Sequence, residues 1–333
     1  MLLKFIGYRL LQLIPLLFVV SILVFFVIQL PPGDFITTYV SELENAGIAV
    51  SESHIQHLRD RYGLDQPFFV QYASWVQNII FHGDLGRSFN WAAPVSEVIS
   101  GRIGITMLIA SLTLLFTWAV ALPIGIFSAV RQYSVFDYIF TFIGFIGLAI
   151  PNFLIALIIL FAVFTTTGVS LTGLFSPEFI GEPWSFAKFL DMLPRLWLPV
   201  VVVGTASTAA LIRVTRAMLL DELQKQYVIT ARAKGVSEKK LLFKYPVRVA
   251  INPLISTIGW TLPTIIGGEI IVSIVLNLPT TGPMLLRALE FQDMYLAGGF
   301  LLIISVLTVI GTLISDILLA WLDPRIRFGG VEE

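Results

Sequence analysis

The sequence has no cysteine and few charged residues. Asp, Glu, Lys and Arg make up 13% of its 333 residues, about half of the 25% that is usual in soluble domains. The missing thiols exclude disulfides, thiolate catalysis, zinc–thiolate sites and iron–sulfur clusters. The low charge, together with a hydrophobic content of 56%, predicts a membrane protein.

The usual catalytic motifs are also missing. The dipeptide Gly-Lys never occurs, so the chain has no P-loop for ATP. It has neither H-E-x-x-H nor G-x-S-x-G. His54 and His57 are spaced to share a helix face and could form half of a metal site, but a solvated helix face is the simpler interpretation. We therefore predict no catalytic residue, no metal site, no enzyme activity and no nucleic-acid partner.

Long apolar runs fill most of the chain. Each reaches about the 20 residues that a transmembrane helix needs, and their continuity excludes the short alternating strands of a membrane β-barrel. The first run is too long for a cleaved signal peptide. We predict an all-α integral membrane protein with six transmembrane helices, at about residues 10–30, 103–129, 138–166, 196–219, 251–276 and 299–321.

The distribution of basic residues predicts the orientation. With a cytoplasmic N-terminus, 14 of the 21 Lys and Arg fall on the cytoplasmic side, as the positive-inside rule requires. Six crossings then return the C-terminus, with "DPRIR" (323–327), to the same side. Residues 31–100 form an acidic extracytoplasmic segment in which we expect a helix at 52–62. The aromatics Phe68, Phe69, Tyr72 and Trp75 after it suit a helix at the membrane interface or one that caps the bundle.

A few residues inside the apolar runs could serve a transport pathway. Glu269 lies within the fifth run beside two glycines, and a charge in a membrane span is often functional. Two interpretations of Glu269 are open: it lines a transport pathway or fixes a gate, or it forms a structural pair with a buried donor. Pro151 and Asn152 lie within the third run, where proline bends a helix and frees a backbone carbonyl. They are further candidates for the pathway or gate.

Charge gathers in one segment. Residues 225–248 hold seven Lys or Arg. "DELQKQYVITARAKG" (221–235) predicts a helix that Gly235 ends. "SEKKLLFKY" (237–245) predicts a second helix with Ser237 as N-cap, and Pro246 ends it. An ordinary positive-inside loop needs no such elbow and no exposed Leu241, Leu242, Phe243 and Tyr245, so these features favour docking to a partner.

Here the sequence resembles a known family. "ARAKG" (231–235), preceded by Tyr227 and followed by Arg248, resembles the cytoplasmic loop of binding-protein-dependent ABC importer permeases. The pieces "RYGLDQP" (61–67), "GDLGRSF" (83–89), "IPNF" (150–153) and "DPRIR" extend the resemblance over nearly the whole chain, to the first permease of oligopeptide, dipeptide and nickel importers. "KYPVRVA" (244–250) departs from that branch, which has a histidine where this chain has Tyr245-Pro246.

The resemblance implies a type I ABC importer permease fold and a set of partners. These are a second homologous permease, two cytoplasmic ATPase subunits, an extracytoplasmic solute-binding protein and the lipid bilayer of a bacterial or archaeal inner membrane. ATP and Mg²⁺ would bind the partners, with no cofactor on this chain. The ATPase-coupling loop would be residues 222–248, with the motif positions Tyr227, Ala231, Arg232, Ala233, Lys234, Gly235, Lys239, Lys240 and Arg248.

Four parts follow from this interpretation: an N-terminal transmembrane helix (1–30), an extracytoplasmic segment (31–100), a permease core of five transmembrane helices (101–323) and a cytoplasmic tail (324–333). The expected solute is a peptide, with oligosaccharides or other small solutes as alternatives. Two other classes stay open from the residues alone. One is a stand-alone secondary transporter or channel, and the other is a membrane enzyme that acts on lipid.

Overall fold

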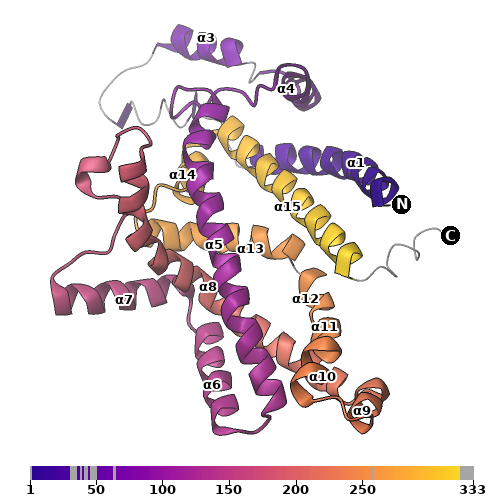
Figure 1. Cartoon of the computed structure of the whole chain (residues 1–333). Helices are drawn as coiled ribbons and strands as arrows, with labels where there is room; N and C mark the ends of the chain where they lie inside the picture. Colours follow the sequence, from indigo (N-terminus) through magenta and orange to yellow (C-terminus); the bar gives the residue numbers. More distant parts are fainter. Residues whose placement is uncertain are drawn as a thin grey trace. The chain divides into compact units, whose positions relative to one another are not determined.

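The chain is helical in the computed structural model (Figure 1). The structure describes residues 2–30, 36–37, 40, 44–45, 51–62, 65–256 and 258–322. Within these ranges the only β-structure is an isolated antiparallel bridge between Arg87 and Pro94. The elements are α1 Leu2–Ile28, α3 Glu52–Tyr62, α4 Phe68–His82, α5 Val95–Val130, α6 Val135–Ala149, α7 Asn152–Thr167, the 3₁₀ turn η1 Pro177–Phe179, α8 Phe186–Leu223, α9 Gln226–Ala233, α10 Glu238–Lys244, α11 Pro246–Ala250, α12 Asn252–Ser256, α13 Ile258–Val275, α14 Thr281–Glu290 and α15 Met294–Leu322.

Several of these helices are long and apolar enough to cross a membrane. Among the described residues, α5, α8 and residues 294–319 of α15 each pass that test, and α6 with α7 passes as a bent pair. Shorter apolar helices lie at Leu11–Val27 of α1 and Thr264–Val275 of α13. The predicted all-α, apolar architecture is therefore confirmed. The predicted helix at 52–62 is confirmed as α3, whereas "DPRIR" lies outside the described residues.

The third apolar run is not one continuous helix, and the expectation of a single kinked span at 138–166 was wrong in this respect. α6 ends at Ala149 and α7 begins at Asn152, with a bend of 102° between them. Pro151 cannot donate a backbone hydrogen bond, and it forces Ile150 into an extended conformation with φ −91° and ψ 125°. The proline therefore breaks the helix completely.

The chain divides into two compact units, and the first contains residues 1–7, 105–279 and 308–333. In this unit α6, α7, α11 and α13 all pack against α8. α5 also approaches α8 closely, because a Cβ on Gly125 would lie 2.6 Å from the Cβ of Thr215, and one on Gly204 would lie 2.8 Å from the Phe116 ring. Small residues at such contacts are typical of helix packing in membranes. They let α8 form the centre of this unit.

The second unit contains residues 8–104 and 280–307. In it α4 packs on α1 through aromatic contacts, with the Phe25 ring 5.3 Å from Phe68, 5.5 Å from Tyr72 and 5.4 Å from Trp75 between ring centroids. The remaining core of this unit comes from α14 and the start of α15, which bury Met284, Leu285, Ala288 and Phe300, among others.

Candidate functional site

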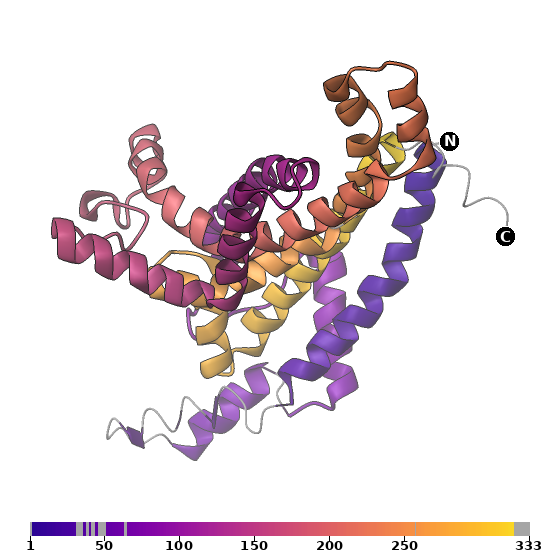
Figure 2. The same ribbon diagram turned by 90° about the horizontal axis from the view of Figure 1, so that it is seen from below.

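The basic segment predicted from the sequence forms three short helices at the end of α8. We call residues 224–250 the elbow segment; it lies at one end of the α8 ribbon, in brown to orange in Figure 2. The chain leaves α8 at Leu223, forms α9, reverses at Gly235 and continues as α10 and α11. α9 contacts α10, and α10 contacts α11. The predicted helix pair and the predicted glycine break are confirmed, whereas the predicted start of the first helix at residue 221 was wrong, because residues 221–223 still belong to α8.

Gly235 makes the reversal possible. Its φ is +78°, a left-handed conformation that glycine adopts without strain. The Gly235 N–H donates to the Arg232 carbonyl at 3.0 Å, and the Val236 N–H donates to the Ala231 carbonyl at 3.3 Å. These two bonds define a Schellman motif, which satisfies the last carbonyls of α9. A Cβ at Gly235 would meet nothing within 4 Å, so backbone conformation alone requires glycine here.

An ion pair bridges the two sides of the reversal. Arg232 Nε donates to Glu238 Oε1 at 2.7 Å and Arg232 Nη2 donates to Oε2 at 3.2 Å, so the pair is bidentate. The hydrogen bond from Arg232 lowers the pKa of Glu238, and the same bond raises the pKa of Arg232. The prediction gave Glu238 only a helix-start role. The opposite charges six residues apart around a glycine were the signal that could have revealed the pair.

The apolar residues of the elbow segment mostly face the protein. Leu241 and Val228 are fully buried, and Leu242 packs against a buried cluster that consists of Ala129, Leu219, Val247 and Ala250. The expectation that Leu241, Leu242, Phe243 and Tyr245 form an exposed side was therefore wrong for most of them. Leu242 attaches the segment to Ala129 of α5 and Leu219 of α8. Phe243 alone of these four is exposed, at 61%, with exposed Tyr227, Ile229 and Val249 elsewhere on the segment.

The motif residues all fall within this cluster of helices. Tyr227, Ala231, Arg232 and Ala233 lie on α9, Lys234 and Gly235 in the turn, Lys239 and Lys240 on α10, and Arg248 on α11. The four basic residues Lys234, Lys239, Lys240 and Arg248 are exposed. The Tyr227 hydroxyl donates to Glu222, and burial, this hydrogen bond and the Glu222 charge raise the pKa of Tyr227. Ser237 is the N-cap of α10, but its side chain makes no capping bond.

A buried ion pair ties the same end of α8 to α6. Arg216 Nε and Nη2 donate to the two carboxylate oxygens of Asp137 at 3.0 and 2.9 Å. Asp137 is buried and also accepts the Tyr133 N–H at 3.0 Å. The sequence analysis missed this pair, although a carboxylate in the first turn of an apolar helix is a signal for one. The elbow segment therefore joins a part of α8 that is braced against both α5 and α6.

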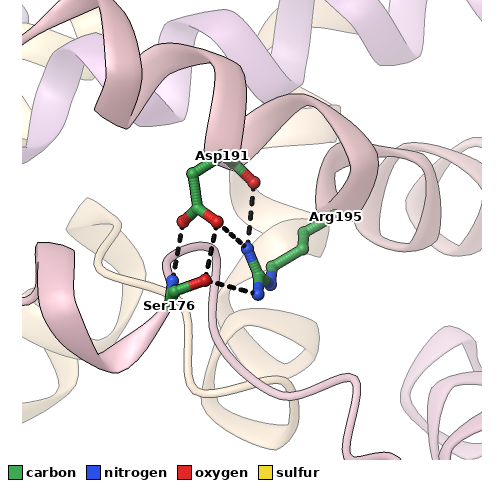
Figure 3. A network of polar contacts seen from close by, with 3 residues as sticks. All are labelled: Ser176, Asp191 and Arg195. Atoms are coloured by element: carbon green, nitrogen blue, oxygen red, sulfur yellow. Dashed lines mark hydrogen bonds and ion pairs between the residues drawn. The ribbon is translucent and has the colours of Figure 1, made fainter.

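At the other end of α8, a polar network fixes the loop that precedes it (Figure 3). Asp191 accepts the Ser176 N–H at 2.7 Å and the Ser176 hydroxyl at 2.6 Å. Arg195 Nη1 donates to Asp191 Oδ1 at 2.7 Å, and Nη2 donates to the Ser176 hydroxyl oxygen at 2.9 Å. The Asp191 carboxylate, the Ser176 hydroxyl and both terminal nitrogens of Arg195 are hydrogen-bonded within the network in Figure 3, so it is a structural clamp on the α7–α8 connection.

In the second unit, the motif "GDLGRSF" packs on the start of α15. Asp293 accepts the Ser88 hydroxyl at 2.5 Å and the Asn90 N–H at 3.1 Å, and burial raises the pKa of Asp293. Gly86 has φ +98°, and a Cβ there would lie 2.8 Å from the Tyr295 ring. The motif therefore has a packing role, in which glycine permits both the turn and the close approach.

The pathway candidates are placed only in part. Pro151 is the N-cap residue of α7 and Asn152 is its first residue, at the 102° corner. Glu269 falls in α13, which packs against α7 and α8, but its side chain lies outside what the structure describes. His54 and His57 lie on α3. The described residues contain no group of three His, Asp or Glu that could hold a metal ion.

Helices that are long and apolar enough to cross a membrane, together with an exposed basic segment after α8, define the class of a membrane protein. Comparison with known families also identifies a membrane component. The family described as "Binding-protein-dependent transport system inner membrane component" matches residues 121–328. The corresponding N-terminal family, "Binding-prot-dependent transport system membrane comp, N-term", matches residues 2–112.

Two named relatives cover nearly the whole chain. The oligopeptide transport system permease protein AppB of Bacillus subtilis is 36% identical over 96% of this chain and 98% of its own length. The dipeptide transport system permease protein DppB of Alkalihalophilus pseudofirmus is 28% identical over 96% and 98%. The chain belongs to the family of binding-protein-dependent transport system inner membrane components, as a permease subunit of an ABC importer. It is a multi-pass inner membrane protein of a transport family, and that family is not an enzyme family.

Proposed function

We propose that this chain forms half of the membrane pathway of a peptide importer and receives the ATP-driven movement through the elbow segment. The single observation that carries the proposal is the structure of that segment. An exposed basic helix pair is anchored to the end of α8 by Leu242 of α10 and by buried Val247 of α11, which follows it. A push on such a helix pair moves α8 with it, because packed interiors deform little.

The peptide substrate class comes from the relatives. Two permeases that match this chain end to end are named for oligopeptide and dipeptide transport. The partners proposed are a second homologous permease, two ATPase subunits that hold ATP and Mg²⁺, and an extracytoplasmic binding protein that delivers the peptide. The solute then moves inward by alternating access between the two permeases.

The proposed topology has six spans. They are α1, α5, the bent pair α6 and α7, α8, α12 with α13, and α15. α13 has 18 residues and the apolar window of α1 has 17, near the lower limit for a span. Both termini and the elbow segment are cytoplasmic in this arrangement, and residues 31–100 and 324–333 are the extracytoplasmic segment and the cytoplasmic tail that flank the spans.

A charge reversal tests the coupling role. The double variant Lys239→Glu, Lys240→Glu removes exposed positive charge from α10 and leaves the buried anchors intact. We expect peptide uptake and peptide-stimulated ATP hydrolysis by the reconstituted complex to fall while the four-subunit assembly stays folded. Arg131→Glu, an exposed charge reversal in the turn after α5, is the matched control and keeps activity. Full stimulated hydrolysis by the double variant would exclude coupling through this surface.

Glu269, Pro151 and Asn152 are proposed to line or gate the pathway. α13, which carries Glu269, packs on α7, which begins at Asn152. We expect Glu269→Gln to reduce peptide uptake while the complex still assembles. Glu97→Gln, a carboxylate in the exposed first turn of α5, serves as control. Normal uptake by Glu269→Gln would leave this carboxylate a structural role only, and uptake without any ATPase subunit would instead indicate a secondary transporter.

A further inference from the structure

Helix α4 exposes a large apolar face. Phe69, Ile80 and Phe81 are exposed by 79%, 68% and 74%, and Val70 is also exposed. The helix, "FFVQYASWVQNIIFH", contains no Lys, Arg, Asp or Glu. An uncharged cluster of exposed aromatic and aliphatic side chains indicates an interaction surface.

The opposite face of α4 is firmly attached to α1. Beyond the Phe25 ring contacts, the Tyr72 hydroxyl and the Ser21 hydroxyl lie 2.8 Å apart, and Gln29 Nε2 donates to Gln71 Oε1 at 3.0 Å. Trp75 is buried in the same contact. Since one face of the helix is held by packing and hydrogen bonds, the exposed apolar face has a fixed direction.

The exposed surface of α4 is itself two-sided. At 3.6 residues per turn, Phe69 and Asn78 are nine residues apart and lie on opposite sides of the helix. Ile80 falls on the Phe69 side, whereas Ser74 lies toward the Asn78 side with Phe81 beside it. The apolar side with Phe69 and Ile80 faces away from Asn78, as in a helix that lies in a membrane interface.

The depth of α4 along α1 points to lipid. The Gln29 and Ser21 contacts are eight residues apart on α1, which is about 12 Å along a helix axis. Ser21 lies inside the apolar stretch Leu11–Val27 of α1. The first half of α4 is therefore held beside residues within the apolar stretch of α1, and not beyond its end.

We infer that α4 is an interfacial membrane helix, which inserts the face that contains Phe69 and Ile80 among the lipid acyl chains at the end of α1. Lipid explains the missing charge, the depth and the continuity with the apolar surface of α1. A soluble partner that binds and leaves would expose these rings to water between encounters. In the proposed topology this is the outer leaflet; the insertion itself does not depend on that topology.

The absence of cysteine allows a clean test. Single variants Phe69→Cys, Ile80→Cys and, as the matched polar-side control, Asn78→Cys are labelled with a nitroxide in the full complex, in lipid nanodiscs. Collision of the label with oxygen, which concentrates in lipid, is compared with collision with a water-soluble nickel chelate. Peptide uptake by each variant confirms that the complex is intact.

We expect collisions with oxygen to dominate at positions 69 and 80 and collisions with the nickel chelate to dominate at position 78. The logarithm of the oxygen-to-nickel collision ratio then changes sign across the helix. Two results would overturn the inference. Nickel access at positions 69 and 80 equal to that at 78 would place the face in water. Exclusion of both reagents at 69 and 80 would show that another protein covers it. If Phe69→Cys does not assemble, Ile80→Cys gives the same comparison.

Discussion

Gly235 offers the sharpest test of the elbow segment. Its φ of +78° lies in the left-handed region, where a residue with a Cβ is disfavoured by about 1–2 kcal/mol. A Cβ would meet no neighbouring atom within 4 Å, so Gly235→Ala adds no clash and this backbone cost is the whole effect. A cost of 1–2 kcal/mol lowers the equilibrium constant of the formed elbow by about 5–30-fold.

Hydrogen exchange measures that constant directly. The Gly235 and Val236 amides are hydrogen-bonded only when the elbow is formed, so we expect Gly235→Ala to speed their exchange by about 5–30-fold. Gly235→Asn should have a smaller effect, because asparagine tolerates this conformation better than alanine does. Peptide-stimulated ATP hydrolysis should fall in the same order, alanine below asparagine below glycine.

Gly168 provides the matched control. It follows α7 with φ +72° and also has nothing within 4 Å of a Cβ, so Gly168→Ala carries the same backbone cost outside the elbow segment. We expect it to leave exchange at positions 235 and 236 unchanged. Unchanged exchange in Gly235→Ala would refute the left-handed turn, and equal loss of coupling in both alanine variants would refute a specific role of the elbow.

Three further outcomes follow from the ion pairs and the second unit. Asp137→Asn removes the carboxylate that pairs with the partly exposed Arg216 and should lower the free energy of unfolding in detergent by about 1.5–3 kcal/mol, which is typical of hydrogen bonds to charged groups; no change would mean that the pair does not brace α8. Gly86→Ala should destabilise the second unit, because the new Cβ would lie 2.8 Å from Tyr295, and a further change of Tyr295 to alanine should relieve part of the loss in thermal unfolding. Arg232 lowers the pKa of Glu238, so the ion pair stabilises the elbow segment at pH values above the ordinary glutamate pKa and loses this effect as the pH falls through the lowered pKa of Glu238. Spin labels on α9 and α10 should then move apart at low pH, and Glu238→Gln should abolish this response.

The sequence predicted the elements that depend on local chemistry. Gly235 and Pro246 mark helix ends through their own backbone properties and Ser237 through the preference of serine for the N-cap position, and the structure places the ends there. Local chemistry did not predict whether the apolar side chains of α10 face the protein or the solvent. Leu241 is buried because α10 packs against α9 and α11, and a nine-residue pattern contains no information about those partners.

Long-range pairs were also beyond the sequence. Asp137 and Arg216 are 79 residues apart, and Ser88 and Asp293 are 205 apart. Only the folded chain brings them together. A bend at Pro151 was predicted, but the complete break was not, because the angle between α6 and α7 depends on what α7 packs against. α13 and α8 supply that packing.

The central claim is that the elbow segment docks an ATPase subunit. A photoreactive amino acid at Phe243, which is exposed on α10, tests it in the assembled importer, and Phe161, a similarly exposed aromatic on α7, is the control position. We predict that position 243 crosslinks to a P-loop ATPase subunit and that position 161 does not. Crosslinks from position 243 to lipid or to the second permease alone, in a complex that still hydrolyses ATP, would contradict the account.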